Sequence, residues 1–397
     1  MIRVAGLPKA STKIPSTFTQ LALVCVAVFA PQAGFAQADA ATIAELRQQI
    51  AQLSARLEQL ESDSREEPAE ASNNWVNNIS VSGDLRTRYE NIDDATSFKD
   101  RNRNRLRARV DLSATVNDDW SASIGLASGG DDPISTNQTL GNAASTKDIR
   151  LDYAYFEYRG IDNLTFTGGK YKNVFYRPGG NAMLWDGDYR PEGLALRYSA
   201  NGLFFNAATM ILESDDRAGQ QDKESMWGAQ LGYRLAGLTF GAGYYDASVK
   251  GSNAFYDADL FGNSADNSGA FLYDYEELEL FADYSFMLQD YEVSLFGDYV
   301  ENLDADTADT GWVIGAGIAR ALWELSYSYQ NLEADAVFAT FADSDYGGGG
   351  TDAKGHIVSA AYELISNTSV GFTYFMNEQI STGSDYDRLQ VDLSVSF

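Results

Sequence analysis

The sequence predicts an all-β fold, a 16-stranded antiparallel transmembrane β-barrel that follows a short N-terminal coiled-coil helix. The first observation is a two-residue period of apolar and polar side chains through residues 78–397. The second is the final segment, in which every second residue from Leu389 to Phe397 is apolar. Alternate side chains of a strand face opposite sides, so each such segment has one apolar and one polar face. Alone, the last segment would also suit an edge strand of a soluble sandwich, but repetition along the chain favours a closed barrel, which leaves no backbone edge exposed to lipid.

The N-terminal segment 1–38 is typical of a secretory signal peptide. Three basic residues precede the uncharged run FTQLALVCVAVFA, and small residues follow it. This order predicts cleavage after Ala36 or Ala38. The apolar run is too short for a transmembrane helix. A lipoprotein leader would instead need Cys25 as the new N-terminus, but Val24 is large for that cleavage.

Cleavage would change the chemistry available to the mature chain. It removes the only cysteine, so no disulfide or thiol chemistry is expected. It also leaves 26 of the 29 basic residues against 57 acidic ones, a net charge of about −31. A surface of this charge repels nucleic acid, which we therefore exclude as a partner.

Residues 39–67 differ in kind and predict a coiled-coil helix. Their apolar residues recur at alternating spacings of three and four, as at the a and d positions of heptads. The expected core positions are Ile43, Leu46, Ile50, Leu53, Leu57 and Leu60. A helix this short is marginal alone, so we expect a partner helix, with a solitary amphipathic helix as the alternative. The polar segment 68–77 then reads as a linker to the barrel at 78–397.

Sixteen strand-like segments fill the rest of the chain. The expected spans are 78–90, 103–117, 119–128, 148–159, 163–173, 190–200, 203–213, 223–235, 238–249, 273–287, 290–301, 311–320, 322–332, 355–365, 368–377 and 385–397. Short connections alternate with long ones, such as 129–147, 174–189, 250–272 and 333–354. An even strand number with tight turns on one side is typical of bacterial outer-membrane barrels, whose turns lie in the periplasm. A barrel of this size has an aqueous lumen, which suggests transport.

The second strand carries the clearest chemistry, because arginine alternates there with apolar residues in RNRNRLRARVDLSATV. An arginine on the lipid face at mid-bilayer costs roughly 2–4 kcal/mol, so these side chains are expected to point into the lumen. The first strand follows the same rule. The expected lumen-facing arginines are Arg86, Arg88, Arg103, Arg105, Arg107 and Arg109. The alternative is that they only stabilise the wall by pairing with acids.

An acidic arc is expected on the opposite wall. Glu277, Glu279 and Asp283 alternate with apolar residues on the tenth strand, and Asp298 follows on the eleventh. Facing arcs of opposite charge set up a field across the lumen.

The fifth strand has a less regular pattern. Lys170 and Lys172 share parity with the apolar residues Leu164 and Phe166. Either a bulge at Gly168–Gly169 resets the alternation, or the lysines lie outside at the rim.

These features resemble the putative porin family of Gram-negative outer membranes. The resemblance lies in VSGDLRTRYE, RNRNRLRARVDLSATVNDDWSASIGLASG, DIRLDYAYFEY and the terminal phenylalanine, within a chain of signal, coiled coil, linker and barrel. It implies a passive outer-membrane diffusion channel for small hydrophilic solutes and ions, without catalysis, cofactor or metal. It also implies a homotrimer in outer-membrane lipid with the coiled coil in the periplasm. Isoleucine at a with leucine at d favours two strands instead, and this conflict stays open.

The resemblance extends to one loop. General porins, a related group, fold their third long loop into the lumen opposite an arginine cluster. By position this loop is 174–189 here, and the resemblance implies Asp186 and Asp188 as the acids that face the arginines. An ordinary extracellular loop is the alternative.

Three other functions need consideration. A basic ladder could guide anions through a substrate-selective channel, although the acidic arc and net charge favour a weak cation preference. The coiled coil could tether the outer membrane to peptidoglycan or to a periplasmic partner. An enzyme is disfavoured, because the single histidine, His356, and the nearby Ser359 fall on opposite strand faces.

Overall fold

The computed structural model describes residues 48, 51–52, 55–56, 78–215 and 223–397. The predicted signal peptide, the six coiled-coil core positions and the linker lie outside the described residues. The described residues from 78 onward belong to one compact unit. In the described part of the chain, no helix is long and apolar enough to cross a membrane.

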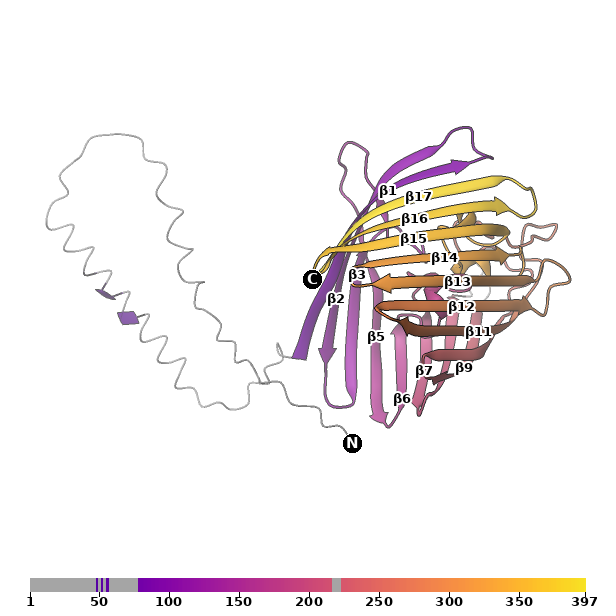
Figure 1. Cartoon of the computed structure of the whole chain (residues 1–397). Helices are drawn as coiled ribbons and strands as arrows, with labels where there is room; N and C mark the ends of the chain where they lie inside the picture. The colour runs from indigo at the N-terminus through magenta and orange to yellow at the C-terminus, as the bar shows by residue number, and fades with distance from the viewer. Residues whose placement is uncertain (1–47, 49–50, 53–54, 57–77, 216–222) are drawn as a thin grey trace, which may run out of the picture. The chain divides into compact units, whose positions relative to one another are not determined.

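Sixteen long strands of the described residues form a closed antiparallel barrel, as the sequence predicts (Figure 1). Each long strand pairs with the next along the chain, and the last pairs with the first to close the ring. The long strands are β1 (Ile79–Asp94), β2 (Arg101–Thr115), β3 (Trp120–Ser128), β5 (Ile149–Ile161), β6 (Leu164–Lys170), β7 (Glu192–Ala200), β8 (Leu203–Glu213), β9 (Glu224–Leu235), β10 (Leu238–Ala247), β11 (Tyr275–Leu288), β12 (Tyr291–Asn302), β13 (Thr310–Arg320), β14 (Trp323–Leu332), β15 (Ala353–Ile365), β16 (Thr368–Gln379) and β17 (Asp385–Ser396). The short β4 (Gln138–Thr139) pairs with β2 from within a loop.

Alternation sorts the side chains of each strand onto two faces. In β11, Leu278 and Leu280 are exposed on the outside, whereas Glu277 and Glu279 are each 1% exposed on the inside. Aromatic pairs lie on the outer face near both barrel ends, for example Trp120 with Tyr158 by the tight turns. Such girdles belong at the two membrane interfaces, so the outer surface suits a bilayer.

The tight turns have the geometry that antiparallel strands require. Asn201 and Gly202 both have positive φ, and so do Ala236 and Gly237. Two positive values at the central residues match the right-handed twist of the flanking strands. A Cβ on Gly202 would lie 2.5 Å from the carbonyl oxygen of Arg234, so glycine is required there.

A bulge in β5 was not expected from the sequence. The register with β3 shifts between Gly125 and Leu126, so that Asp152 has no partner of its own. Asp152 and Tyr153 consequently both line a lumen cavity although they are adjacent in the chain. The irregularity therefore lies in β5 and not at the glycine pair of β6.

The two lysines near β6 separate in space. Lys170 pairs in register with Ala154 and Glu192, on the outer-face parity of the strand. Lys172 lies past the end of β6, 3.7 Å from Asp111 and over the ring of Tyr153. Only Lys170 thus occupies the outer rim.

Two long loops fold inward and pack together: loop L3 (residues 171–191) and loop L7 (residues 333–352). Tyr189 of L3 stacks on Phe341 of L7, with ring centroids 4.0 Å apart. Trp185 and Met183 of L3 are buried in the same apolar cluster. The inward course of L3 was expected, whereas no sequence pattern indicated that L7 joins it.

Candidate functional site

The arginines of β1 and β2 stand opposite one another across the strand pair. Arg86 is the register partner of Arg107, and Arg88 is the partner of Arg105. Like charges directly opposite are destabilising, so this wall needs counter-charges nearby.

Acids on the same strands supply part of that counter-charge. Asp84 lies 2.8 Å from Arg107 and 2.7 Å from Arg109. Glu90 accepts a hydrogen bond from Arg103. Since these acids share the inner face with the arginines, much of the charge of the wall is neutralised locally.

Two further residues join the ion pairs of this wall, Arg388 of β17 and Asp345 of L7, and the sequence analysis assigned neither. Arg388 of β17 is only 3% exposed and pairs with Glu90 and, at 2.7 Å, with Asp345 of L7. Asp345 also lies 3.1 Å from Arg88. Although burial opposes its ionisation, Arg388 and Arg88 hold the pKa of Asp345 below its usual value. Arg388 could have been found from its place on the polar face of the last strand, but nothing marks Asp345.

Two arginines of the wall, Arg86 and Arg105, are not closely paired with a carboxylate. Arg86 lies 3.8 Å from Asp392 and donates to Asn137 Oδ1 at 2.7 Å. Arg105 has no carboxylate within ion-pair distance among the described residues and donates to the backbone oxygen of Asn137 at 3.5 Å. The Nε atoms of both arginines are buried without a hydrogen-bond partner.

The two acids that the resemblance placed in L3 have different surroundings. Asp188 lies 3.2 Å from Arg109 and accepts from Thr136 Oγ1 at 2.9 Å. Burial opposes ionisation, but Arg107 and Arg109 hold the pKa of Asp188 below its usual value. Asp186 instead faces L7.

Asp186 connects the two loops. It accepts from the backbone of Ser344 at 3.1 Å, and its own N–H donates to the carbonyl of Phe341 at 2.7 Å. Burial and the nearby Asp343 raise the pKa of Asp186 well above its usual value. Burial also raises the pKa of Asp343, to about 6. The contact between L3 and L7 therefore contains two carboxyl groups that resist ionisation.

The acidic wall is held by hydrogen bonds from the loops. Asp283 accepts from Tyr176, and Asp298 accepts from Asn181 at 2.9 Å, both donors being in L3. L3 thus reaches from β2 on one side of the barrel to β11 and β12 on the other.

Glu277 and Glu279 lie beneath this cover. The backbone N–H of Phe338 in L7 donates to Glu277 at 2.7 Å. Glu279 accepts from Gln230 at 3.0 Å and from Tyr245 at 2.8 Å. Both carboxylates point inward, but neither faces open solvent.

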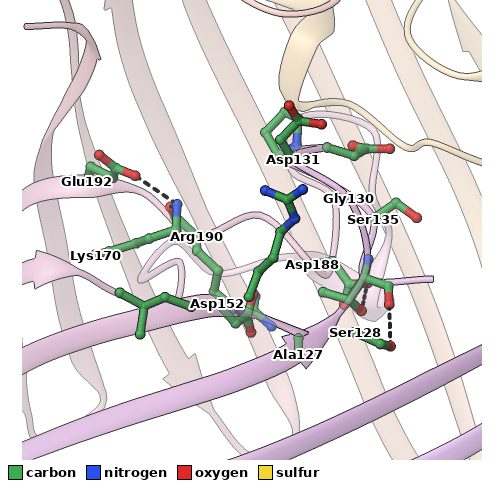
Figure 2. Close-up of a pocket in the computed structure, with 15 residues that line it drawn as sticks. Ala127, Ser128, Gly130, Asp131, Ser135, Asp152, Lys170, Asp188, Arg190 and Glu192 are labelled. Atoms are coloured by element: carbon green, nitrogen blue, oxygen red, sulfur yellow. Dashed lines mark hydrogen bonds and ion pairs between the residues drawn. The ribbon is translucent and has the colours of Figure 1, made fainter. Parts of the chain in front are cut away.

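Two of the cavities that border L3 contain most of its charged neighbours. One, of about 540 Å³, brings together Asp131, Asp152, Asp188 and Arg190, with Lys170 and Glu192 at one side (Figure 2). The other, of about 280 Å³, lies between L3 and the β2–β5 wall. Open space lined by charged side chains therefore remains beside the loop on the side of the basic wall.

The single histidine lies away from the lumen. His356 accepts or donates one hydrogen bond through Nδ1, with Tyr327 at 2.8 Å, and both are on the outer face. Ser359 is on the inner face, where it bonds Thr373. Residues 78–215 and 223–397 bring no three metal-ligating side chains into one group that could hold an ion.

Comparisons with known proteins bear on these features. Residues 93–269 and 311–397 match the model of a family described as "Putative porin". A substituted variant of the Rhodopseudomonas blastica porin superposes with a TM-score of 0.51 at 13% identity, over 80% of this chain and 100% of that one. The OmpF protein of Salmonella typhi, in a complex with daunomycin, gives 0.50 at 15% identity, over 80% and 97%. No curated protein is significantly similar in sequence.

Proposed function

The chain belongs to the putative porin family, a family of outer-membrane channel proteins, and we propose that it conducts small hydrophilic solutes and ions by passive diffusion. One observation carries this proposal: L3 crosses the interior of a closed barrel from a basic wall to an acidic one. Such a loop narrows the lumen, and the cavities beside it are lined by charged side chains. Channels select by the charged groups that line such narrow sections.

The residues of the narrow section follow from the same geometry. We assign the basic side to Arg86, Arg88, Arg103, Arg105, Arg107 and Arg109, and the facing acids to Asp188 and Asp283. Asp186 faces L7 and contributes less negative charge, because burial raises its pKa. Glu277 and Glu279 contribute to the field from beneath the loops and not by direct contact with solutes.

Single-channel recording in planar bilayers tests the proposal. The purified mature protein should give stepwise conductance in potassium chloride. Failure to conduct any ion, with the barrel shown intact by its heat-modifiable electrophoretic mobility, would reject it.

We propose a weak preference for cations. Asp84, Glu90, Asp345 and Asp392 neutralise most of the arginine wall, and the rest of the chain is strongly acidic. Reversal potentials in a potassium chloride gradient should therefore show modest selectivity for potassium.

A substrate-selective anion channel is the second candidate. Its support is the incomplete counter-charge of Arg86 and Arg105. Strong selectivity for chloride in the same gradient would favour it over the cation-preferring channel.

The assembly and the N-terminal region complete the proposal. The apolar outer face suits outer-membrane lipid, and we propose a homotrimer, which unheated electrophoresis and cross-linking would test. The heptads at 39–67 support a periplasmic coiled coil that binds peptidoglycan or a periplasmic protein. Deleting 39–67 should abolish sedimentation with cell-wall material while conductance remains. Mass measurement of the mature chain would test cleavage after Ala36 or Ala38.

A further inference from the structure

The cavity of about 280 Å³ beside L3 is lined by more basic than acidic side chains. Its cationic residues are Arg109, Lys172, Arg177 and Arg190, and its acids are Asp111, Asp152 and Asp186. Burial raises the pKa of Asp186 and so weakens its contribution as an anion. The cavity thus has an excess of positive charge inside an acidic protein.

Two of the four cations are already well paired. Arg109 contacts Asp84 and Asp188, and Arg190 contacts Asp152 at 3.2 Å. These two hold L3 against the wall and have little capacity left for a solute.

The other two cations are less committed. Lys172 is 3.7 Å from Asp111, at the long end of ion-pair distances, and is half exposed. Among the described residues, Arg177 has no carboxylate within ion-pair distance. Its guanidinium makes one hydrogen bond, from Nη1 to the carbonyl of Trp185 at 3.0 Å. Arginine has five N–H donors, so most of its hydrogen-bonding capacity remains unused.

The space in front of Arg177 is kept open by a glycine. A Cβ on Gly187 would lie 3.6 Å from Nη1 and 3.7 Å from Nη2 of Arg177. Gly187 lines the same cavity, so the absent side chain leaves the guanidinium accessible from it.

A further donor borders the cavity without a partner. Oδ1 of Asn173 accepts a hydrogen bond from the backbone N–H of Phe175, so Nδ2 of the same amide points away from that backbone. Nδ2 is buried and has no hydrogen-bond partner. Phe175 and Tyr153 add apolar surface to the lining.

We propose that this cavity is a binding site for small organic carboxylates, with Arg177 and Lys172 as the anion-binding side chains. The fork of Arg177 matches the two oxygens of a carboxylate, Lys172 adds a point charge, and the amide of Asn173 supplies a neutral donor. The apolar wall favours an organic acid over inorganic phosphate. This inference rests on the proposed channel function, in which the site holds a solute on its way through.

Benzoate is a suitable probe for the mature full-length protein. Titration calorimetry in detergent should show saturable binding, and benzoate should reduce potassium chloride conductance in bilayers over the same concentrations. Arg177→Gln should weaken binding at least tenfold. Lys172→Gln, at a more exposed position that tolerates change, should weaken it about threefold.

Two further variants make the test specific. Arg177→Lys keeps the charge but not the fork, and should recover only part of the affinity. Lys354→Gln removes a lysine that pairs with Glu378 on the outer-face parity of β15, away from the cavity, and should leave binding unchanged. Each variant must keep its heat-modifiable mobility.

Several outcomes would overturn the inference: no saturable benzoate binding by the wild type, equal binding by Arg177→Gln and Lys354→Gln, or equally strong binding of phosphate. These outcomes are separate from failure of the channel itself. A protein that conducts ions but does not bind benzoate retains the proposed function and loses this site, whereas a protein that binds benzoate saturably but conducts no ion keeps the site and loses the channel.

Discussion

The basic and acidic walls of this barrel arise from the same strand periodicity but have different environments. On the basic wall, Arg107 and Arg109 pair with Asp84 and stay partly open to the lumen. On the acidic wall, Glu277 and Glu279 lie under loops and are satisfied by hydrogen bonds from neutral donors. Periodicity therefore decides which face a charge occupies, whereas the loops decide whether a solute can reach it.

The largest expected effect tests the most buried pairing of the basic wall. Arg388→Ala leaves Glu90 and Asp345 buried without their main counter-charge, which should cost about 3–5 kcal/mol of unfolding free energy. Urea unfolding in micelles measures this. The matched control is Arg320→Ala, which removes an exposed pair with Asp290 and should cost less than about 1 kcal/mol. A similar loss of unfolding free energy in the two variants would show that the buried ion pairs stabilise the fold no more than an exposed pair does.

The second prediction concerns pH at the contact between L3 and L7. In the folded protein the pKa of Asp343 is raised from the ordinary 3.8 to about 6, so the folded state holds this proton more tightly. The protonated Asp343 stabilises the folded state by about 1–3 kcal/mol. This contribution is complete below about pH 3.8 and is lost as pH rises through 6. Asp343→Asn should abolish that part of the pH dependence in urea unfolding between pH 4 and 7. Asp290→Asn, at an exposed position, is the control and should leave the pH dependence unchanged. If the unfolding free energy of Asp343→Asn varied with pH as steeply as that of the wild type, the assignment to Asp343 would be wrong.

The third prediction concerns selectivity. Asp345→Asn removes one negative charge from Arg88 and Arg388, so the narrow section becomes more basic. The permeability ratio of potassium to chloride should fall by about two- to fivefold in reversal-potential measurements. Glu378→Gln, which removes an acid paired with Lys354 on the outer-face parity, is the control and should leave the ratio unchanged. An unchanged ratio in both variants would remove Asp345 from the selectivity mechanism.

The smallest effect is expected on the acidic wall. Glu279→Gln keeps the shape of a side chain that is 1% exposed and hydrogen-bonded to Gln230 and Tyr245. Its effect on the permeability ratio should be well below that of Asp345→Asn. A comparable shift would show that ions reach beneath the loops, and the contrast between the two walls would fail.

The strands were predictable because a bilayer imposes one rule on every span. The predicted 203–213 coincides with β8, and the other spans differ from the structure by a few residues at their ends. The inner face of the arginines follows from the same rule, because the cost of placing them in lipid is large. Local periodicity thus determined the barrel wall.

The bulge at Asp152 and the pairing of Asp345 were beyond such reasoning. A bulge depends on how β5 meets β3, which the sequence of β5 alone does not specify. L7 has no periodic pattern, and its place depends on Phe341 meeting Tyr189 of L3 more than a hundred residues earlier. Contacts of this kind are set by tertiary packing and have no local signature.

The position of Asp345 has a consequence for folding. Its two cationic partners belong to β1 and β17, the two strands whose pairing joins the beginning of the barrel to its end. Before that seam forms, Arg88 and Arg388 are far apart along an open sheet, and one carboxylate cannot hold both. Asp345 can therefore make both ion pairs only after β1 and β17 have paired, which makes this buried ion-pair network a late product of assembly.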